Sequence, residues 1–176
     1  MLITPEYQTL QSQFHLERPD YGISGSKHVE PILNFSKKLN TRDILDYGCG
    51  KATLQKGIPF PIQNYDPCTE EYNRRPQPAA IVVCTDVLEH IEIACLKDVL
   101  DDLANLTKHI LFVNVACRPA KKFLPDGRNA HLIQETPNWW LTWLLPRFTL
   151  HSFQASNGEF TALLMPLQIP SETNNV

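Results

Sequence analysis

A short apolar run that ends in an acid and two glycines constrains the fold of this chain more than any other segment. Residues 43–53 read Asp-Ile-Leu-Asp-Tyr-Gly-Cys-Gly-Lys-Ala-Thr, which places Asp46, Gly48 and Gly50 after the apolar residues. The pattern predicts a buried strand, a tight turn and a helix, because glycine accepts positive φ and lets a ligand approach the backbone. Free N–H groups of the turn would favour polar or anionic ligand groups. A plain tight turn is the alternative interpretation.

Apolar segments of two kinds alternate along the chain. Continuous apolar runs predict strands covered on both faces, and 3.6-residue spacing predicts amphipathic helices. The expected strands are 43–47, 61–66, 79–85 and 109–115, and the expected helices are 27–39 (capped by Ser24 or Ser26), 51–56, 87–106 and 137–145. Residues 1–25 are expected to form an N-terminal helix or arm. This order predicts an α/β fold with a Rossmann-like, doubly wound sheet.

The end of the chain has a different pattern. Two β-rich runs, 147–155 and 159–165, flank Ser156-Asn157-Gly158, and Asn-Gly between such runs predicts a hairpin. We therefore expect a mostly parallel sheet with a C-terminal antiparallel hairpin strand. The whole chain, 1–176, is interpreted as one domain whose residues 166–176 are frayed.

Acidic residues follow two further strands of the expected sheet. Asp66 and Asp86 come directly after the runs 61–66 and 79–85. Because ligands of such sheets bind outside the carboxyl ends of the strands, these acids should lie near the glycine turn. An acid at the end of the second strand typically accepts both ribose hydroxyls of a nucleoside. The alternative is a simple turn acid before Pro67.

The glycine pattern argues against a dinucleotide cofactor. Binding of a pyrophosphate at the helix start requires the third glycine of Gly-x-Gly-x-x-Gly. Gly50 is followed by Lys51, Ala52 and Thr53, so that glycine is missing. An NAD-dependent dehydrogenase is accordingly the least favoured of the functions considered.

Four segments together resemble class I S-adenosylmethionine-dependent methyltransferases, over roughly residues 20–165. The segments are Asp46-Tyr47-Gly48-Cys49-Gly50, Tyr65-Asp66-Pro67, Thr85-Asp86-Val87-Leu88-Glu89-His90-Ile91 and the closing hairpin. The resemblance implies a seven-stranded sheet and S-adenosyl-L-methionine as cofactor. It implies that the cofactor is bound by Asp46, Tyr47, Gly48, Cys49, Gly50, Asp66, Pro67, Asp86 and Val87. Asp46 would hold the amino group and Asp66 the ribose, while Asp86 and Val87 would lie beside the reactive centre.

The chain also departs from that family. Only ~16 residues separate Gly50 from Asp66, which is short for a parallel crossover. Between Asp66 and Ala79 no clear third strand is found, so the sheet is expected to have as few as six strands. A non-catalytic module that binds S-adenosylmethionine or a nucleotide therefore stays an alternative to a methyltransferase.

Four polar residues are candidates for the chemistry on the acceptor. His131 is the first candidate catalytic base, because an unperturbed imidazole titrates near neutral pH. His90 is the second, as the resemblance implies, since members of that family often carry a Glu-His pair at this position. Arg128 and Asn129 precede His131 in the loop after strand 109–115 and are the candidate substrate-binding residues. The alternatives are a backbone-bonded or helix-capping His131, a Glu89-His90 pair that supports the fold, and a surface Arg128.

Composition limits the substrate and the setting. The chain has 176 residues and a net charge of −3, which gives no electrostatic case for nucleic acid. Five cysteines without Cys-x-x-Cys spacing predict reduced thiols, a cytoplasmic location and no metal site. Residues 1–10 lack a signal-peptide pattern, and no apolar run approaches the ~20 residues that span a membrane. We expect methylation of oxygen or nitrogen on a small polar metabolite or sugar.

Overall fold

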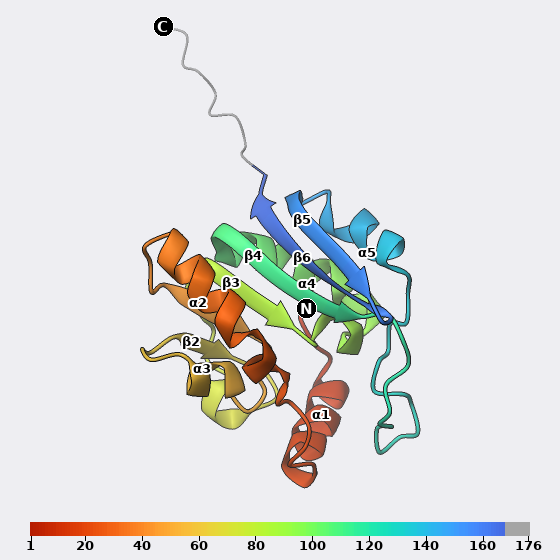
Figure 1. The fold of residues 1–176 in the computed structure, drawn as a ribbon. Helices are drawn as coiled ribbons and strands as arrows, with labels where there is room; N and C mark the ends of the chain where they lie inside the picture. The colour runs from red at the N-terminus through yellow and green to blue at the C-terminus, as the bar shows by residue number, and fades with distance from the viewer. Residues whose placement is uncertain (168–176) are drawn as a thin grey trace, which may run out of the picture.

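The computed structural model describes residues 1–167, which form an α/β fold around one six-stranded sheet (Figure 1). Its strands are β1 (Ile44–Tyr47), β2 (Gln63–Tyr65), β3 (Ala79–Thr85), β4 (Thr107–Ala116), β5 (Phe148–Ser156) and β6 (Glu159–Pro166). The strand order is β2-β1-β3-β4-β6-β5. The first four strands are parallel, and β6 and β5 add an antiparallel hairpin. The predicted fold class is thus confirmed. Of the tail expected to be frayed, 168–176 lie outside the described residues.

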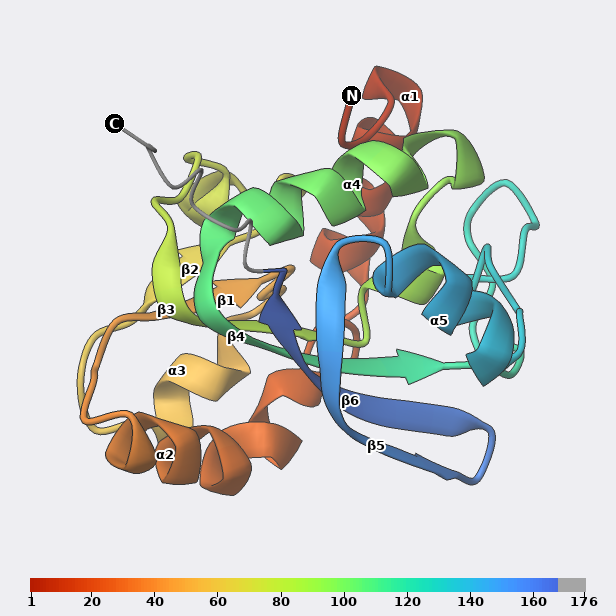
Figure 2. The same cartoon turned by 90° about the horizontal axis from the view of Figure 1, so that it is seen from above.

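Helices cover both faces of the sheet (Figure 2). The helical segments are α1 (Pro5–Glu17), η1 (Ser24–His28), α2 (Val29–Lys38), α3 (Thr53–Gly57), η2 (Glu70–Tyr72), η3 (Leu88–His90), α4 (Ile93–Leu106) and α5 (Pro137–Leu144). α2 and α3 pack on one face, where Ile32 and Leu54 join its core cluster. α4 and α5 pack on the other face, where Leu103 and Trp140 are fully buried. None of these helices is long and apolar enough to cross a membrane.

β3 shows why its sequence has no polar alternation. All seven of its residues are buried. Ile81 and Val83 belong to the core beneath α2, while Val82 and Cys84 belong to the core beneath α4. Successive side chains of a strand point to opposite faces, so a strand covered on both sides needs apolar residues throughout.

The edge beside β2 explains why the sheet has six strands and not the seven implied by the resemblance. The Gln63 side chain donates to Gln77 O at 3.2 Å and accepts from Gln77 N at 2.9 Å. This side chain occupies the hydrogen-bonding position that a further strand would take. Pro76 and Pro78 flank Gln77 and supply no N–H donor for a ladder. Within the described residues, 66–79 therefore contribute only the short helix η2.

The helix predicted over 87–106 is broken in two. η3 ends at His90, and α4 begins at Ile93 after two residues with extended backbone. Hydrogen bonds with the N-terminal segment stabilise this break. The Tyr7 hydroxyl donates to His90 O at 2.8 Å, and the Glu92 carboxylate accepts from Thr4 N and Thr4 Oγ1, both at 3.0 Å. The apolar periodicity of residues 87–106 did not predict the break, because these partners lie more than 80 residues away in the sequence.

The predicted cap of the second helix is also wrong. Residues 24–28 form the 3-10 helix η1, and α2 starts after His28 without a side-chain cap. Ser24 Oγ instead donates to Asp86 Oδ2 at 2.6 Å, and Ser26 Oγ donates to Ile23 O at 3.3 Å. Both serines are therefore engaged elsewhere.

α1 lies beside the carboxyl ends of the parallel strands (Figure 1). Its start is capped by Thr4, and Gln8 Nε2 donates to Pro67 O at 2.7 Å, just beyond β2. The N-terminal helix expected within residues 1–25 is thus present. It covers the edge of the sheet where the predicted site residues gather.

Candidate functional site

The backbone N–H groups of the turn after β1 are all hydrogen-bonded within the protein. Every N–H group of residues 48–52 donates to a protein oxygen, and the acceptors are the backbone of Tyr65, Gly22 and Cys49 and the carboxylate of Asp66. The helix that follows, α3, has only five residues. The expectation of free N–H groups for an anionic ligand is therefore wrong. The neighbouring strand and the 18–23 loop already use those donors.

The two glycines of this turn are required by conformation and by space. Gly48 has φ 75° and Gly50 has φ 52°, the left-handed region that glycine adopts at low cost. A Cβ on Gly48 would collide with the Val87 side chain, and one on Gly50 would lie 2.6 Å from Gly22 O. Protein atoms thus occupy the close approach that the sequence suggested for a ligand.

Asp66 ties the end of β2 to the glycine turn. Its side chain is buried, with Oδ2 accepting from Gly50 N at 3.0 Å and Oδ1 from Cys68 N at 2.8 Å. A carboxylate has about four lone-pair sites. Two remain for hydroxyl donors on the side where Asp66 lines a cavity.

Asp46, at the end of β1, carries an unpartnered charge. It is 3% exposed, and its Oδ2 has no hydrogen-bond partner among the described residues. Burial, and then the nearby charge of Asp66, raise the pKa of Asp46 to about 7. A buried carboxylate without a counter-charge is costly, so this oxygen is suited to a cationic or donating ligand group.

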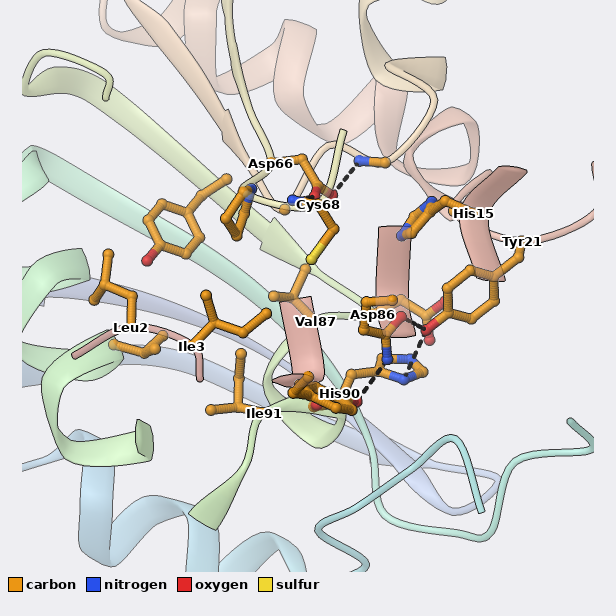
Figure 3. A pocket seen from close by; sticks show the side chains of 18 residues that line it. Leu2, Ile3, His15, Tyr21, Asp66, Cys68, Asp86, Val87, His90 and Ile91 are labelled. Carbon is orange, nitrogen blue, oxygen red and sulfur yellow. Dashed lines mark hydrogen bonds between the residues drawn. The ribbon is translucent and has the colours of Figure 1, made fainter. Parts of the chain in front are cut away.

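The strand ends and the N-terminal segment enclose a cavity of about 100 Å³ (Figure 3). We call it the glycine-turn cavity. The predicted cofactor residues on its wall are Tyr47, Gly48, Gly50, Asp66, Pro67, Asp86 and Val87. Asp46 and Cys49 lie behind the turn and line a small adjoining pocket with Asp86. The outer wall includes Leu2, Ile3, Tyr7, Gln11 and His15.

The turn after β3 begins with a strained residue. Asp86 has φ 58°, uncommon for any residue other than glycine. This conformation directs the chain into η3 and leaves the Asp86 carboxylate between the glycine-turn cavity and a second cavity. Burial alone would raise the pKa of Asp86, but His90 and the hydrogen bond from Ser24 outweigh it, and the net pKa is lowered.

The two predicted bases, His90 and His131, lie against each other beside Asp86, where the two cavities meet. We call this place the corner. The rings of His90 and His131 have centroids 4.8 Å apart, at an interplanar angle of 85°. His90 Nδ1 lies 2.7 Å from Ala130 O, and His131 Nδ1 lies 2.6 Å from Arg118 O. A backbone carbonyl only accepts, so both Nδ1 atoms carry a proton, and in a neutral ring the lone pair then lies on Nε2. Burial lowers the pKa of His90 to about 4.

Glu89 completes the corner and was missed as a functional residue. It is 0% exposed, its Oε1 accepts from Ala116 N at 2.7 Å, and its Oε2 has no hydrogen-bond partner among the described residues. The available signal was the Asp-x-x-Glu-His spacing of residues 86–90. With a continuous helix over 87–106, that spacing suggested capping.

The predicted substrate residues lie elsewhere in the loop after β4. Both polar side-chain atoms of Asn129 form hydrogen bonds within the loop. Oδ1 accepts from the N–H groups of Ala120 and His131, and Nδ2 donates to Ala120 O. Arg128 pairs with Asp126 and stacks over Tyr7, 5.3 Å from the ring centroid. Neither residue lines the glycine-turn cavity or the second cavity.

The second cavity, of about 610 Å³, has a basic wall that the sequence analysis did not single out. We call it the basic groove. Its charged lining consists of Lys27, Arg118, Lys121 and Lys122 together with Asp20 and Asp86. It shares Asp86 and His90 with the glycine-turn cavity, and His131 lines it as well. The corner at Asp86 is thus the junction between the two.

No protein-family model matches the sequence, and no curated protein matches it at a significant level. Solved structures do. An N1-methyltransferase from Burkholderia thailandensis, bound to 1,6-didemethyltoxoflavin and S-adenosylhomocysteine, superposes with a TM-score of 0.62 and 14% identity. The match covers 94% of this chain and 92% of that one.

Two further structures give the same picture. The N-methyltransferase NodS from Bradyrhizobium japonicum, bound to S-adenosylhomocysteine, has a TM-score of 0.62 at 11% identity, with 92% and 99% of the chains covered. Magnesium protoporphyrin IX methyltransferase from Synechocystis, bound to S-adenosylmethionine, has a TM-score of 0.57 at 14% identity, with 91% and 92% covered. Over most of its length, the chain has the fold of class I S-adenosylmethionine-dependent methyltransferases.

Proposed function

We propose that the protein is an S-adenosylmethionine-dependent methyltransferase acting on oxygen or nitrogen of a small polar molecule. The observation that carries the proposal is the presence of two buried acids, Asp46 in β1 and Asp66 directly after the adjacent strand β2, in a methyltransferase fold. Asp46 offers an unpartnered buried oxygen, and Asp66 offers free lone pairs on a cavity wall. These are the acceptors that an amino group and a ribose need.

The residues fit the cofactor on the chemistry of their donor set. Asp46 would accept from the α-amino group and Asp66 from the ribose hydroxyls. The other walls would come from Tyr47, Gly48, Cys49, Gly50, Pro67 and Val87. S-adenosylmethionine supplies a methyl group activated on a sulfonium. Because the turn has no free N–H groups, a pyrophosphate finds no donors there, which disfavours NAD.

The acceptor would approach from the basic groove. Lysine and arginine side chains on its wall favour a polar or anionic acceptor, and the shared corner brings that acceptor next to Asp86. The protein's main work in such a transfer is alignment and exclusion of water. His90 and His131 have Nε2 atoms suited either to accept a proton or to bind a cation. Arg128 and Asn129 stay predictions for acceptor binding.

The glycine-turn cavity is small for a nucleoside cofactor, so we expect the N-terminal segment to move when the cofactor binds. Ligand pockets typically enclose roughly 300–1,000 Å³, against about 100 Å³ here. Polar contacts tie the segment to the rest of the chain from Met1 to Asp98, Thr4 to Glu92, Tyr7 to His90 and Gln8 to Pro67. We expect Leu2 and Ile3 to shift outward in the bound state.

Calorimetry with S-adenosylhomocysteine tests the proposal. We expect binding by the wild-type chain, at least tenfold weaker binding by Asp46→Asn, and unchanged binding by Asp101→Asn, a control on the outer side of α4. Assays for S-adenosylhomocysteine formation with small alcohols, sugars and amines then separate an enzyme from a binding module. NADH binding without S-adenosylhomocysteine binding would refute the proposal.

A further inference from the structure

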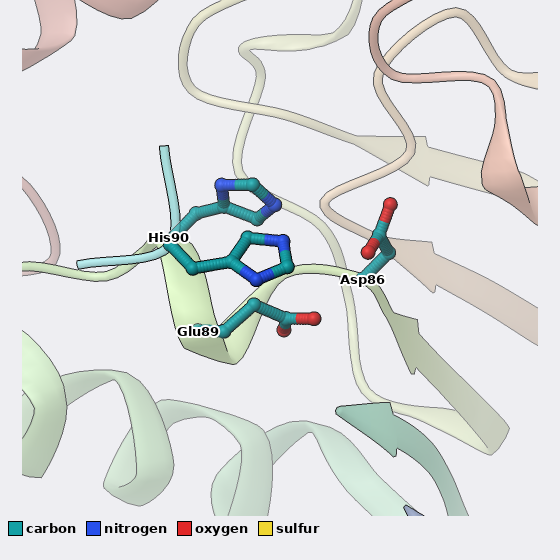
Figure 4. Close-up of side chains that lie close together, drawn as sticks. Asp86, Glu89 and His90 are labelled. Carbon is teal, nitrogen blue, oxygen red and sulfur yellow. The ribbon is translucent and has the colours of Figure 1, made fainter. Parts of the chain in front are cut away.

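Four potential metal ligands converge where the two cavities meet. Asp86, Glu89 and His90 come from the turn after β3, and His131 comes from the loop after β4. Each offers one ligand atom, and these atoms all lie within 4.8 Å of one another. Figure 4 shows the three that share the turn, with their side chains on the same side of η3. Convergence from two separate segments requires the tertiary fold to build it.

The histidines are oriented as metal ligands are. In each ring the Nδ1–H is fixed by a backbone carbonyl, Ala130 O for His90 and Arg118 O for His131. Such a hydrogen bond from the far nitrogen sets the tautomer and the ring orientation of a ligating histidine. In neutral rings, both Nε2 lone pairs are thereby available.

The carboxylates show the same division between a fixed atom and a free atom. Asp86 Oδ2 accepts from Ser24, and Glu89 Oε1 accepts from Ala116 N. Glu89 Oε2 is left buried and without a hydrogen-bond partner among the described residues, although the side chain is 0% exposed. The carboxylates of the half-buried Asp86 and the buried Glu89 repel each other unless a positive charge lies between them.

We propose that Asp86, Glu89, His90 and His131 bind one divalent cation. Two carboxylates neutralise the charge of a dication, and two neutral imidazoles complete four protein ligands. Imidazole nitrogen suits Zn²⁺ and Fe²⁺, while carboxylate oxygen suits Mn²⁺ and Mg²⁺. The mixed set with no thiolate therefore favours Mn²⁺, Fe²⁺ or Zn²⁺ over Ca²⁺, which takes oxygen ligands only.

The position of the cluster gives the cation a use. Asp86, His90 and His131 line the basic groove, so an open coordination position would face the acceptor. This part rests on the proposed function: it selects acceptors with a hydroxyl group that can coordinate a cation, and so favours oxygen over nitrogen as the methylated atom. It also assigns the two histidines to holding the cation and not to removing a proton directly.

Titration of the full, chelator-treated chain with Mn²⁺ tests the site without cofactor or acceptor. We expect one Mn²⁺ per chain by calorimetry and by electron paramagnetic resonance, with Zn²⁺ competing. Glu89→Gln and His131→Gln should each weaken binding at least tenfold. Glu89→Gln retains an oxygen for Ala116 N–H, and circular dichroism checks its fold. His151→Gln, on the exposed face of β5, is the matched control and should bind as the wild type does.

The outcomes separate this proposal from the preceding one. Absence of Mn²⁺ and Zn²⁺ binding by the folded wild-type chain would refute the cation site while leaving S-adenosylhomocysteine binding untouched. Unchanged affinity in His131→Gln would refute it as well, even if Glu89→Gln failed to fold. Cation binding in a chain that does not bind S-adenosylhomocysteine would support the site and refute the methyltransferase.

Discussion

The turns after β1 and β3 lie side by side, yet their polar groups are arranged in opposite ways. In the turn after β1 the backbone donors are satisfied by Tyr65, Asp66 and the 18–23 loop. In the turn after β3, Asp86, Glu89 and His90 each have one polar atom fixed by a hydrogen bond, while Glu89 Oε2 has no partner among the described residues. In the first turn, residues 48–52, the backbone donors are used within the protein, and we call this turn the frame. The second turn presents oriented side-chain atoms that can bind a ligand.

This contrast indicates which residues of this small fold give it specificity. The glycine motif, the most recognisable part of the sequence, shapes the cavity and offers no backbone donors to a ligand. Recognition falls to side chains: Asp46 and Asp66 beside the frame, and the corner of Asp86 with its neighbours. Substitutions in the frame should therefore act on stability, and substitutions of the side chains on binding.

The largest effect is expected at Gly48. Gly48→Ala combines a φ of 75° with a collision against Val87 and should lower the free energy of unfolding by roughly 2–6 kcal/mol. Gly127 is the matched control, because its φ is 87° but a Cβ there would meet nothing within 4 Å. Gly127→Ala should cost only about 1 kcal/mol in urea unfolding.

A double substitution separates the two contributions at Gly48. Val87→Ala removes the colliding methyl groups, so Gly48→Ala should cost less in that background, by about 1–3 kcal/mol. If Gly48→Ala and Gly127→Ala lowered the free energy of unfolding equally, the turn would tolerate a Cβ at Gly48, contrary to the collision with Val87.

The second effect concerns Asp46 and depends on pH. Its pKa is raised from 3.8 to about 7, so between these values the folded state binds more protons than the unfolded state. Stability then falls as pH rises through this window, by roughly 2–4 kcal/mol in total. Asp46→Asn should match the wild type near pH 4 and exceed it in stability at pH 8.

Thermal unfolding of both proteins from pH 4 to 8 measures this difference, with Glu135→Gln, at an exposed position before α5, as a control for generic charge removal. The cofactor's amino group needs the ionised form of Asp46. Affinity for S-adenosylhomocysteine should therefore rise through pH 7 in the wild type and lose this rise in Asp46→Asn. A parallel pH profile in the two proteins would show that Asp46 is not the titrating group.

The third effect lies at Asp66, which belongs to both the frame and the binding side chains. Asp66→Ala removes an acceptor of hydroxyl groups and should weaken S-adenosylhomocysteine binding roughly ten- to a hundredfold by calorimetry. It also leaves the N–H groups of Gly50 and Cys68 without acceptors, so unfolding should become easier. Lost stability with unchanged affinity would restrict Asp66 to the frame.

Local patterns predicted the parts of the fold that local forces decide. β3 follows its apolar run from Ala79 to Thr85, and the Asn157-Gly158 turn joins β5 to β6 as expected. The missing third strand was visible as a polar, proline-containing segment. These features depend on burial and turn chemistry within a few residues.

Long-range contacts decided what the sequence could not predict. Thr4 and Tyr7 hold the break between η3 and α4, and only with that break does Glu89 join His90 as a potential ligand instead of opening a helix. Arg118 O orients His131 from 13 residues away. The candidate cofactor residues were predictable as strand ends, whereas the four-ligand corner depends on tertiary pairing.

The smallest effect should arise where the N-terminal segment meets the corner. The Glu92 carboxylate accepts two hydrogen bonds from Thr4 at a partly exposed position, so Glu92→Gln should cost under about 1 kcal/mol of stability. Because that contact helps to hold the cavity closed, loosening it should tighten S-adenosylhomocysteine binding about two- to fivefold. Glu135→Gln, an exposed glutamate in the loop before α5, should change neither quantity. Weaker binding in Glu92→Gln would mean that the segment completes the site and does not obstruct it, which would place Leu2 and Ile3 among the binding residues.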